Sequence, residues 1–457
     1  FPTRRSSDLY PYICANKMLP FGYPTIYYGS TCDYQKLKRG GYFGYVRCQV
    51  IPPPDCVLGL LPSIVNDKLQ FDLRPKVGTW FTEELYLAME KGYAVDEIYE
   101  VFHFDENNRS SSYFRGYMSF FLRLKQEAEG WVKAGASSET PSDEEKERVR
   151  QELYVQNGYM AKMVTENVRK KPVNRALAKR NLNCLWGKLA QDSYKDDKRM
   201  VFNYDEWMQE IILNPMVDQT SLKYRTMAGS SYMCYFSLQN EFAKGNVRVN
   251  IWMASAVTAW ARTILHERMF VVGPENVLYC DTDSVVFIKK RDDTTEYTAR
   301  GLGNWTDETE EGDEIEQFLA LAPKCYMKIE RNNPTGSMKA KGVRMTVSNK
   351  EKTSYEIIAG ILEQELMYPE EEKADPLQLD NMVIAPNCLD SNYPYASMFT
   401  RYGKKILRAV LNKRKAVPFP EGSKRRKLMD GEVDRLYLQP CGDEHNPHYD
   451  GVYSKFE

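Results

Sequence analysis

The stretch Tyr-Cys-Asp-Thr-Asp-Ser, residues 279–284, stands between two short apolar runs, residues 277–278 and 285–287. Apolar, β-branched and aromatic residues on both sides of a polar centre predict a hairpin with buried arms and a rigid tip. The tip carries two carboxylates, Asp281 and Asp283, and magnesium takes one or two hard carboxylate ligands from a protein. The stretch therefore predicts part of a metal site, with an ordinary Asp-rich turn as the alternative.

A second stretch, Lys-Arg-Asn-Leu-Asn-Cys-Leu-Trp-Gly-Lys at residues 179–188, has a helical pattern. Lys179 and Asn183 are four residues apart and share one helix face, where a cation and an amide can meet the triphosphate and base of a nucleotide. Trp186 lies one turn further and offers a stacking surface. Taken alone, an amphipathic basic helix explains these residues about equally well.

The first stretch resembles the motif Y-x-D-T-D-S of the family B DNA polymerases. This resemblance implies that Asp281 and Asp283 are catalytic, with Asp283 as the principal metal ligand and Asp281 as its support. It also implies that Thr282 lies against DNA. A reverse transcriptase would carry adjacent aspartates, which this stretch lacks.

The second stretch resembles the family's motif K-x-x-x-N-S-x-Y-G, with Cys184 in place of the serine and Trp186 in place of the tyrosine. The resemblance implies that Lys179, Asn183 and Trp186 bind the incoming nucleotide and that Gly187 approaches DNA. The two substitutions bear on nucleotide selectivity, although tryptophan keeps an aromatic stacking surface.

Two shorter stretches follow in the family's order. Lys324-Cys325-Tyr326 resembles the K-x-Y element, which implies a catalytic role for Lys324 and a contact of Tyr326 with the primer end. Lys339 and Lys341 follow where the family turns from palm to thumb, and the resemblance implies that both contact DNA. Solvated lysines on a strand are the alternative for this last pair.

Residues 9–13, Leu-Tyr-Pro-Tyr-Ile, resemble the end of the family's first motif, D-x-x-S-L-Y-P. The resemblance implies that Leu9 and Tyr10 contact the nucleotide, with Tyr10 as the steric gate against ribose 2′-hydroxyls. The metal-binding aspartate is expected at position 5, which holds Arg5, and the motif serine at position 8, which holds Asp8. The offset of Asp8 from position 5 would turn its carboxylate to the other face of a strand.

The resemblance implies an α+β, right-hand polymerase fold with a palm sheet, a helical fingers hairpin and a thumb. The motif spacing resembles the protein-primed group of phages, adenoviruses, linear plasmids and self-synthesising transposons, and the ending Trp-Gly-Lys favours the transposon type. Residues 1–9 are expected to be a tail derived from a sequencing adapter, with a polar amino-terminal tail as the alternative. Residues 10–139 are expected to form the first part of the palm with an insertion, and residues 140–192 the fingers. Residues 193–345 are expected to form the second part of the palm with an insertion and the catalytic hairpin, and residues 346–457 the thumb and carboxy-terminal region.

Composition is that of a globular protein with several subdomains, because 457 residues exceed one compact core. The net charge of −1 hides two basic segments, 161–180 and 401–427, and one acidic segment, 306–316. Ten cysteines without a C-x-x-C pair indicate reduced thiols and an intracellular location. No apolar run approaches the roughly 18 residues of a membrane span, so we expect no membrane contact.

Local patterns predict strands and turns over residues 10–75 and a strand over 93–104. A helix is expected from Thr82 to Gly92, with Glu83 and Glu84 in its first turn. The polar segment 135–147 is expected to be a linker or the cap of the next helix.

Pro172 interrupts the helical pattern that runs to residue 190, which predicts two helices joined by a short connection and packed as an antiparallel hairpin. A long core helix is predicted over residues 250–269, with Arg262 and Glu267 facing solvent. Near the end of the chain, Cys441, His445 and His448 match no standard metal-site spacing and are interpreted as loop residues.

The function implied by the resemblance is nucleotidyl transfer from a deoxynucleoside triphosphate to a primer end on a DNA template, with two magnesium ions as cofactors. DNA and a priming protein are the implied partners. We expect no exonuclease activity from this chain, and poor polymerisation because Arg5 replaces a carboxylate. A catalytically dead DNA-binding remnant is one alternative, and a capsid or priming accessory protein is another, which the clustered carboxylates disfavour.

Overall fold

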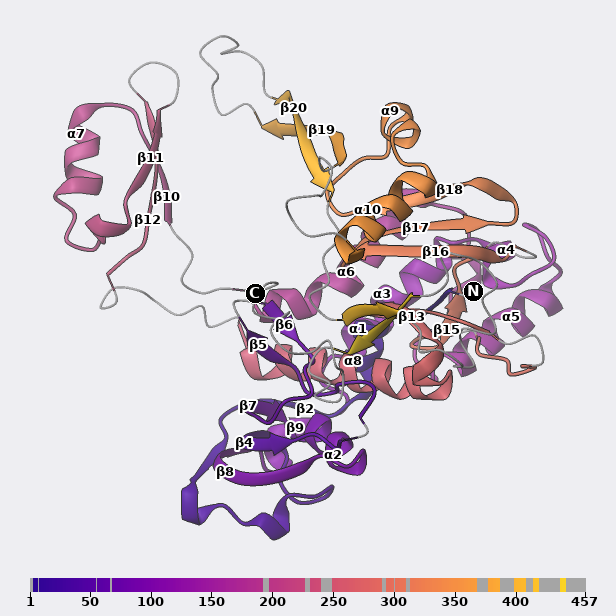
Figure 1. Ribbon diagram of the computed structural model, residues 1–457, viewed down its shortest axis with the longest axis horizontal. Helices are drawn as coiled ribbons and strands as arrows, with labels where there is room; N and C mark the ends of the chain where they lie inside the picture. Colours follow the sequence, from indigo (N-terminus) through magenta and orange to yellow (C-terminus); the bar gives the residue numbers. More distant parts are fainter. Residues whose placement is uncertain are drawn as a thin grey trace.

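The computed structural model describes most of the chain (Figure 1). The described residues are 3–6, 8–54, 56–65, 68–191, 197–226, 231–239, 249–289, 293–299, 301–309, 313–367, 377–386, 398–407, 414–418 and 436–440. Helices and strands are mixed along the chain, and the α+β fold class is confirmed. None of the described helices is long and apolar enough to cross a membrane.

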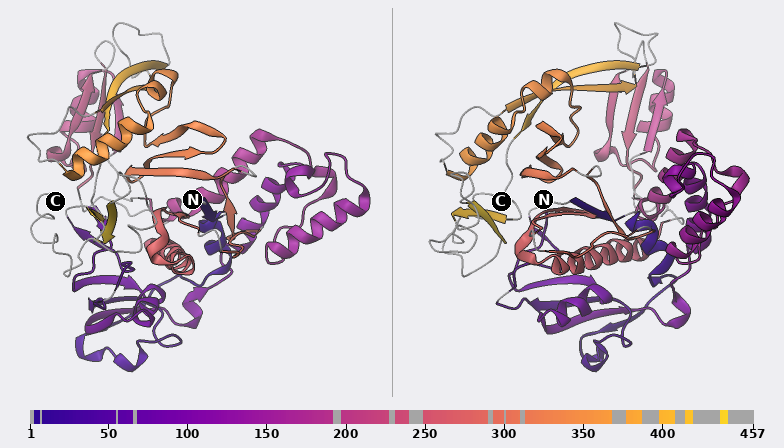
Figure 2. Two further views of the ribbon diagram at one scale, coloured as in Figure 1. Left: turned by 45° about the vertical axis from the view of Figure 1, so that its right-hand side comes forward. Right: turned by 90° about the vertical axis from the view of Figure 1, so that its right-hand side faces the viewer.

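The central sheet is antiparallel and has the strand order β13-β14-β1-β15. Its strands are β13 (Val277–Asp281), β14 (Ser284–Phe287), β1 (Thr3–Ser6) and β15 (Trp305–Asp307). The predicted hairpin is therefore confirmed, but only its second arm, β14, is buried, whereas β13 is half-buried. The early strand β1 lies between the two late strands β14 and β15. Helix α8 (Ile251–Val271) runs alongside this sheet (Figure 2) and packs against β14.

Helix α1 (Leu9–Asn16) follows β1 directly. The prediction of strands from residue 10 is wrong here, because Leu9, Ile13 and Cys14 turn inward at helical spacing and are buried. Pro11 lies in the first turn, where a backbone N–H has no partner within the helix, so the proline costs little. Helix α1 packs against α3 (Arg115–Glu127), α6 (Pro172–Leu189) and α8 in the main hydrophobic core.

A second antiparallel sheet follows α1 and has the order β3-β8-β4-β7. Its strands are β3 (Thr25–Tyr28), β8 (Ala94–His103), β4 (Gly44–Ile51) and β7 (Lys76–Phe81), with the small pairs β2 (Leu19–Pro20) with β9 (Arg109–Ser110), and β5 (Ser63–Val65) with β6 (Lys68–Gln70). The predicted helix is confirmed as α2 (Thr82–Glu90), which packs against α8. The predicted strand 93–104 is confirmed as β8.

The two helices predicted on either side of Pro172 are confirmed as α5 (Asp143–Gln156) and α6, with Pro172 at the first helical position. Ser142 caps α5 by accepting a hydrogen bond from the Glu145 amide, so segment 135–147 does contain a helix cap. The predicted pairing of these helices is wrong. Helix α6 packs against α3, while α5 packs with the short α4 (Trp131–Ala134), because the connection over residues 157–171 is long enough to separate them.

Residues 197–239 form a module that stands apart from the rest of the molecule (Figure 1). It contains β10 (Asp197–Val201), α7 (Tyr204–Trp207) with a π-helical continuation (Met208–Ile212), β11 (Lys223–Thr226) and β12 (Tyr232–Phe236). The strands form a sheet of order β10-β12-β11 over a core of its own. Next to the module, the Asn250 amide donates a hydrogen bond of 2.9 Å to the Leu189 carbonyl, so the chain leaves and re-enters the main body at one place.

The last well-packed unit contains the sheet β16-β17-β18 and the helices and strands after it. Its elements are β16 (Ile315–Ala322), β17 (Cys325–Glu330), β18 (Asn333–Ala340), α9 (Val347–Glu351), α10 (Tyr355–Met367), β19 (Leu377–Pro386) and β20 (Met398–Leu407). Its core joins Met327, Ile358 and Leu379. Strands β21 (Arg414–Pro418) and β22 (Leu436–Pro440) pair with each other, while Cys441, His445 and His448 and parts of the segments 306–316 and 401–427 lie outside the described residues.

Candidate functional site

The tip of the β13–β14 hairpin is a two-residue turn formed by Thr282 and Asp283, because Asp281 pairs with Ser284 across the strands. Thr282 has a φ of 54°, a conformation that strains a β-branched residue. The arm after the turn, Val285 to Phe287, is fully buried. A strained turn on a buried arm holds the two aspartates in a fixed position.

Lys324 neutralises Asp281 directly. Its Nζ lies 2.9 Å from both carboxylate oxygens of Asp281, and its backbone N–H donates a 2.9 Å hydrogen bond to the Tyr279 hydroxyl. Burial raises the pKa of Tyr279 to about 12, so this hydroxyl stays protonated. Lys324 itself lies in the β16–β17 turn with a φ of 59°. The predicted K-x-Y lysine and the first aspartate of the hairpin are therefore in contact.

Position 5 belongs to the same cross-strand row as Asp281 of the predicted metal site. Arg5 pairs with Ser284 on one side and Thr306 on the other, and Ser284 pairs with Asp281. Directly paired residues share one face of an antiparallel sheet. The backbone therefore places position 5 on the face that carries Asp281, where the resemblance expects the missing aspartate.

Asp8 serves a different purpose from the one that its sequence position suggests. It is the residue before α1, with a φ of 50°, and not part of a strand. Its carboxylate forms an ion pair with Lys125 of α3, and the two side chains are only 6% and 12% exposed. The interpretation of Asp8 as a displaced residue on the other strand face is wrong, because the chain turns into a helix at this point.

Tyr10 and Trp186 bring the first and second motifs together. Their rings meet edge to face with centroids 4.7 Å apart. Burial raises the pKa of the Tyr10 hydroxyl, and the charges of Asp283 and Asp281 raise it further, whereas Arg262 lowers it. Tyr10 thus lies within electrostatic range of both aspartates. Leu9 is buried in the main core, so its side chain is a packing residue.

The remaining predicted residues of α6 lie along its exposed side. Lys179 and Gly187 are exposed, and the Asn183 side-chain amide donates a 2.9 Å hydrogen bond to the Lys179 carbonyl. A Cβ atom added at Gly187 would meet no other atom within 4 Å, so the glycine leaves open space beside the helix. Lys179, Asn183 and Gly187 follow one another at four-residue intervals and therefore share one face.

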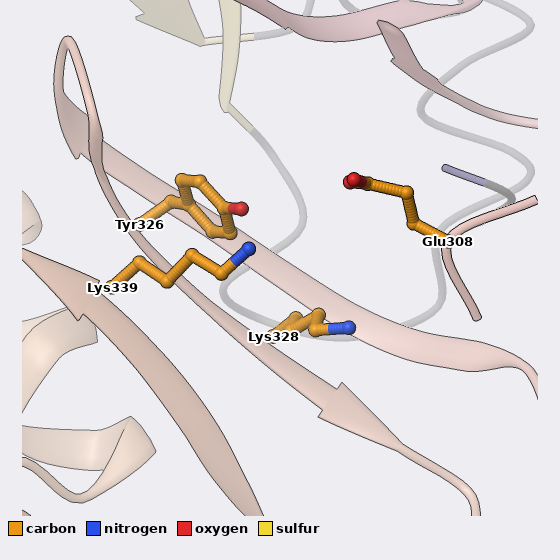
Figure 3. Close-up of a pocket in the computed structure, with 4 residues that line it drawn as sticks. All are labelled: Glu308, Tyr326, Lys328 and Lys339. Atoms are coloured by element: carbon orange, nitrogen blue, oxygen red, sulfur yellow. The ribbon is translucent and has the colours of Figure 1, made fainter. Parts of the chain in front are cut away.

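Tyr326, Lys328 and Lys339 line a pocket of about 320 Å³, with Glu308 on the opposite side (Figure 3). Tyr326 pairs with Lys339 across β17 and β18, and the Lys339 ammonium lies 5.6 Å from the Tyr326 ring. The Tyr326 ring in turn lies 5.3 Å from Tyr279 of the hairpin. The two predicted DNA contacts Tyr326 and Lys339 are thus adjacent to each other and to the metal motif.

Lys341 is exposed just beyond β18. Its carbonyl accepts a hydrogen bond from the Lys405 ammonium of β20. This contact joins the end of β18 to β20 within the same unit and uses the backbone oxygen of Lys341 rather than its side chain.

Two arginines of α8 were missed as site residues. Arg262 was predicted to face solvent, but it binds Glu84 of α2 with nitrogen–oxygen distances of 2.5 and 2.8 Å, and their side chains are 27% and 1% exposed. Arg268 donates a hydrogen bond to the Gly303 carbonyl, and its charge acts on Asp283. The sequence did offer a signal for both residues, because each is a charged residue inside an otherwise apolar helix.

Two comparisons with known proteins found similarities, one in sequence and one in fold. Residues 7–134 match the family described as DNA polymerase type B, organellar and viral. The chain is also similar to the solved structure of Phi29 DNA polymerase complexed with primer-template DNA and incoming nucleotide substrates, with a TM-score of 0.51, 15% identity and coverage of 89% of this chain and 57% of that chain. The chain has the fold of a family B DNA polymerase. The expected right-hand polymerase fold is therefore confirmed.

Two further Phi29 DNA polymerase structures were matched. The post-translocation binary complex with primer-template DNA has a TM-score of 0.47, 16% identity and coverage of 78% of this chain and 52% of that chain. The orthorhombic crystal form has a TM-score of 0.48, 16% identity and coverage of 78% and 53%. The chain therefore spans about half the length of the Phi29 DNA polymerase chains. No curated protein sequence matched.

Proposed function

We propose that this chain is the polymerase region of a template-directed DNA polymerase that transfers a nucleotide from a deoxynucleoside triphosphate to a primer end. The observation that carries the proposal is the meeting of four separate sequence motifs at one place. Tyr10 contacts Trp186 and lies in the field of Asp283, while Lys324 pairs with Asp281. A purely structural role for these residues would not explain why the charged side chains of Asp281, Asp283 and Lys324 gather on half-exposed strands and turns.

The parts of the chain then take the following roles. The central sheet with α1 and α8 acts as the palm, residues 140–192 contribute α6 as the nucleotide-facing fingers helix, and the elements after residue 346, which share a core with β16–β18, act as the thumb. Because α6 packs on α3, the fingers pair includes α3, which lies before residue 140. Lys179 and Asn183 bind the nucleotide, Tyr10 selects against ribose, and the residues that hold DNA are Tyr326, Lys339, Lys341, Thr282 and Gly187.

Asp281 and Asp283 fit magnesium, because both offer hard carboxylate oxygens from one rigid turn. The described residues contain no group of three or more histidine, cysteine, aspartate or glutamate side chains that could hold a metal, so these two aspartates would hold the ions together with substrate phosphates. Magnesium held there would supply the positive charge that makes a primer 3′-hydroxyl more acidic and that stabilises a leaving pyrophosphate. The Lys324 ammonium balances the charge of Asp281.

The finer proposal is that the chain serves a self-replicating element of the transposon type and uses a priming protein. The support for this proposal is the motif spacing and the Trp-Gly-Lys ending of residues 186–188. Detection of a covalent protein–nucleotide product with a candidate priming protein would test it.

The proposed activity is tested by magnesium-dependent primer extension with the chain as written, with Arg5→Asp, and with Arg5→Asp combined with Asp283→Asn. Asp8 is left in place, because its removal would leave Lys125 as an unpaired, mostly buried charge. We expect Arg5→Asp to raise the extension rate by about 100-fold or more, since one carboxylate at a two-metal site is worth several kcal/mol.

Asp283→Asn should abolish the gain from Arg5→Asp. No extension by any variant, with DNA binding retained, would contradict the proposal and favour the alternative of a DNA-binding remnant. The alternative draws its support from Arg5, which places a cation where the family has a carboxylate.

A further inference from the structure

A second pocket, of about 670 Å³, is lined by residues of α3, the helix that packs against α6. One wall is α3, which contributes Arg115, Phe120 and Arg123, and the other wall is the end of α5 and the residues after it. None of its lining residues belongs to the sequence motifs described above. It lies one helix away from the predicted nucleotide-binding residues of α6.

The pocket is strongly basic. Arg115, Arg123 and Lys162 line it, and none of the described lining residues carries a carboxylate. Arg115 is already bound to Asn16 and to the Gly158 carbonyl, so it acts mainly as a brace between α3 and the opposite wall. The Arg123 Nε is buried without a hydrogen-bond partner among the described residues, although the Glu127 carboxylate lies 3.8 Å away. Arg123 and Lys162 are therefore the cations suited to a ligand.

The pocket also presents aromatic rings to solvent. Phe120 is 48% exposed and Tyr159 is 63% exposed, and the Tyr159 ring packs edge to face on Tyr154 at 5.6 Å. Tyr159 has a φ of 59°, a conformation that tyrosine seldom adopts and that persists only where the surroundings hold it. Each wall pairs a ring with a cation, because Arg123 lies 5.6 Å from Phe120 and Lys162 lies 6.0 Å from Tyr154.

We propose that this pocket binds one or two nucleotides of single-stranded DNA, with a base on Phe120 or Tyr159 and the phosphates on Arg123 and Lys162. Exposed rings beside cations are the combination by which proteins hold single strands, since every base has a face to stack and every link has a charge. A duplex hides its base faces, and an acidic peptide would satisfy the cations but not the rings. The identity of the strand as the unpaired template rests on the proposed polymerase function.

Binding of a fluorescent oligothymidylate tests the pocket without any polymerisation, so its failure is separable from failure of the proposed function. The charge variant is Arg123→Gln with Lys162→Gln, and the ring variant is Phe120→Leu with Tyr159→Leu. Two exposed lysines that do not line the pocket, Lys38→Gln with Lys133→Gln, form the charge-matched control. Thermal melting of each variant checks that it is folded.

We expect the ring variant to weaken single-strand binding by about 5- to 100-fold, the range for loss of one stacked base. The charge variant should lower the slope of log affinity against log salt by about 1.4, from two lost phosphate contacts at about 0.7 each. The control pair should leave the affinity of the pocket unchanged within about twofold. 2-Aminopurine in the oligonucleotide should be quenched by the unmodified protein and not by the ring variant.

Equal losses in the charge variant and the control pair would overturn the proposal, because the effect would then be one of net charge. A charge variant that loses polyglutamate binding but keeps oligothymidylate binding would overturn it in favour of an acidic protein partner. Primer extension by the Arg5→Asp chain, together with unchanged strand binding by the ring variant, would refute the pocket while leaving the polymerase function intact.

Discussion

Glu84 and Arg262 show how a single pair of residues supports the candidate site from outside it. Glu84 comes from α2 and Arg262 from α8, and the charge of Arg262 acts on Tyr10. Burial raises the pKa of the Glu84 carboxyl, while Arg262 opposes this shift. A buried carboxylate with one cationic partner is costly to leave unpaired, so the pair holds α2 against α8, the helix that packs on the β13–β14 hairpin.

Replacing Glu84 by glutamine should therefore lower the free energy of unfolding by about 3–5 kcal/mol, the usual cost of breaking one side of a buried ion pair. Urea unfolding followed by circular dichroism measures this loss. Glu83→Gln is the matched control, because Glu83 pairs with the half-exposed Arg39 and should cost less than about 1 kcal/mol. Equal, small losses in both variants would show that the Glu84 pair is not a structural lock.

At the scale of elements, α8 links the central sheet to the sheet after α1, because it packs against both β14 and β7. It begins at Asn250, which caps it by accepting a hydrogen bond from the Met253 amide. His266 lies on its buried side, where Nε2 is 3.2 Å from the Leu58 carbonyl. Burial lowers the pKa of His266 to about 4. Protonation of the His266 imidazole therefore weakens the packing of α8.

A histidine whose folded pKa is depressed gives stability that is present above its unfolded pKa of about 6.5 and is lost as the pH falls toward the folded value. Between pH 7.5 and pH 5, the His266 contribution should fall by about 2 kcal/mol, as an order of magnitude. The difference in unfolding free energy between the unmodified chain and His266→Gln measures it, because carboxylate effects cancel. A difference that stays constant with pH would contradict the shifted titration.

The helices and strands followed from the sequence where local patterns were strong, as for α2, β8 and the β13–β14 hairpin. The strand interpretation failed for Leu9–Asn16, because aromatic and apolar residues in a short run fit both periods and the partners α3, α6 and α8 decide between them. The partner of α6 could not be predicted either, since Pro172 shows where a helix begins but not which helix it meets. Arg262 needed its partner Glu84, which is distant in sequence.

At the scale of the whole molecule, the module over residues 197–239 is separable from the rest. Among the described residues, its elements pack on one another over Val201, Ile211 and Phe236. The hydrogen bond between the Asn250 amide and the Leu189 carbonyl shows that both ends of the insertion meet. The main body therefore does not depend on the module for its own packing.

Replacing residues 192–248 with a short Gly-Ser linker should leave the melting temperature of the main body within about 2 °C, since chain closure across a short gap costs little. Differential scanning calorimetry and size-exclusion chromatography measure this outcome. The same replacement of residues 315–340, which carry Lys324, serves as the contrasting variant and should destabilise the protein strongly. Loss of the folded state on removal of the module would show hidden dependence between the two parts.

The position of β1 between β14 and β15 also constrains how the protein can fold. Among the described strands, residues 3–6 pair with residues 284–286 and 305–307, so the sheet that carries the Thr282–Asp283 turn contains the strand pairings that are most distant in sequence. Closing such long loops costs chain entropy before the strand contacts can stabilise the fold, and a high contact order therefore slows folding. During synthesis, β1 can pair only after β14 and β15 have left the ribosome. The helices and the module over residues 197–239 can form before that point, and the central sheet is completed late.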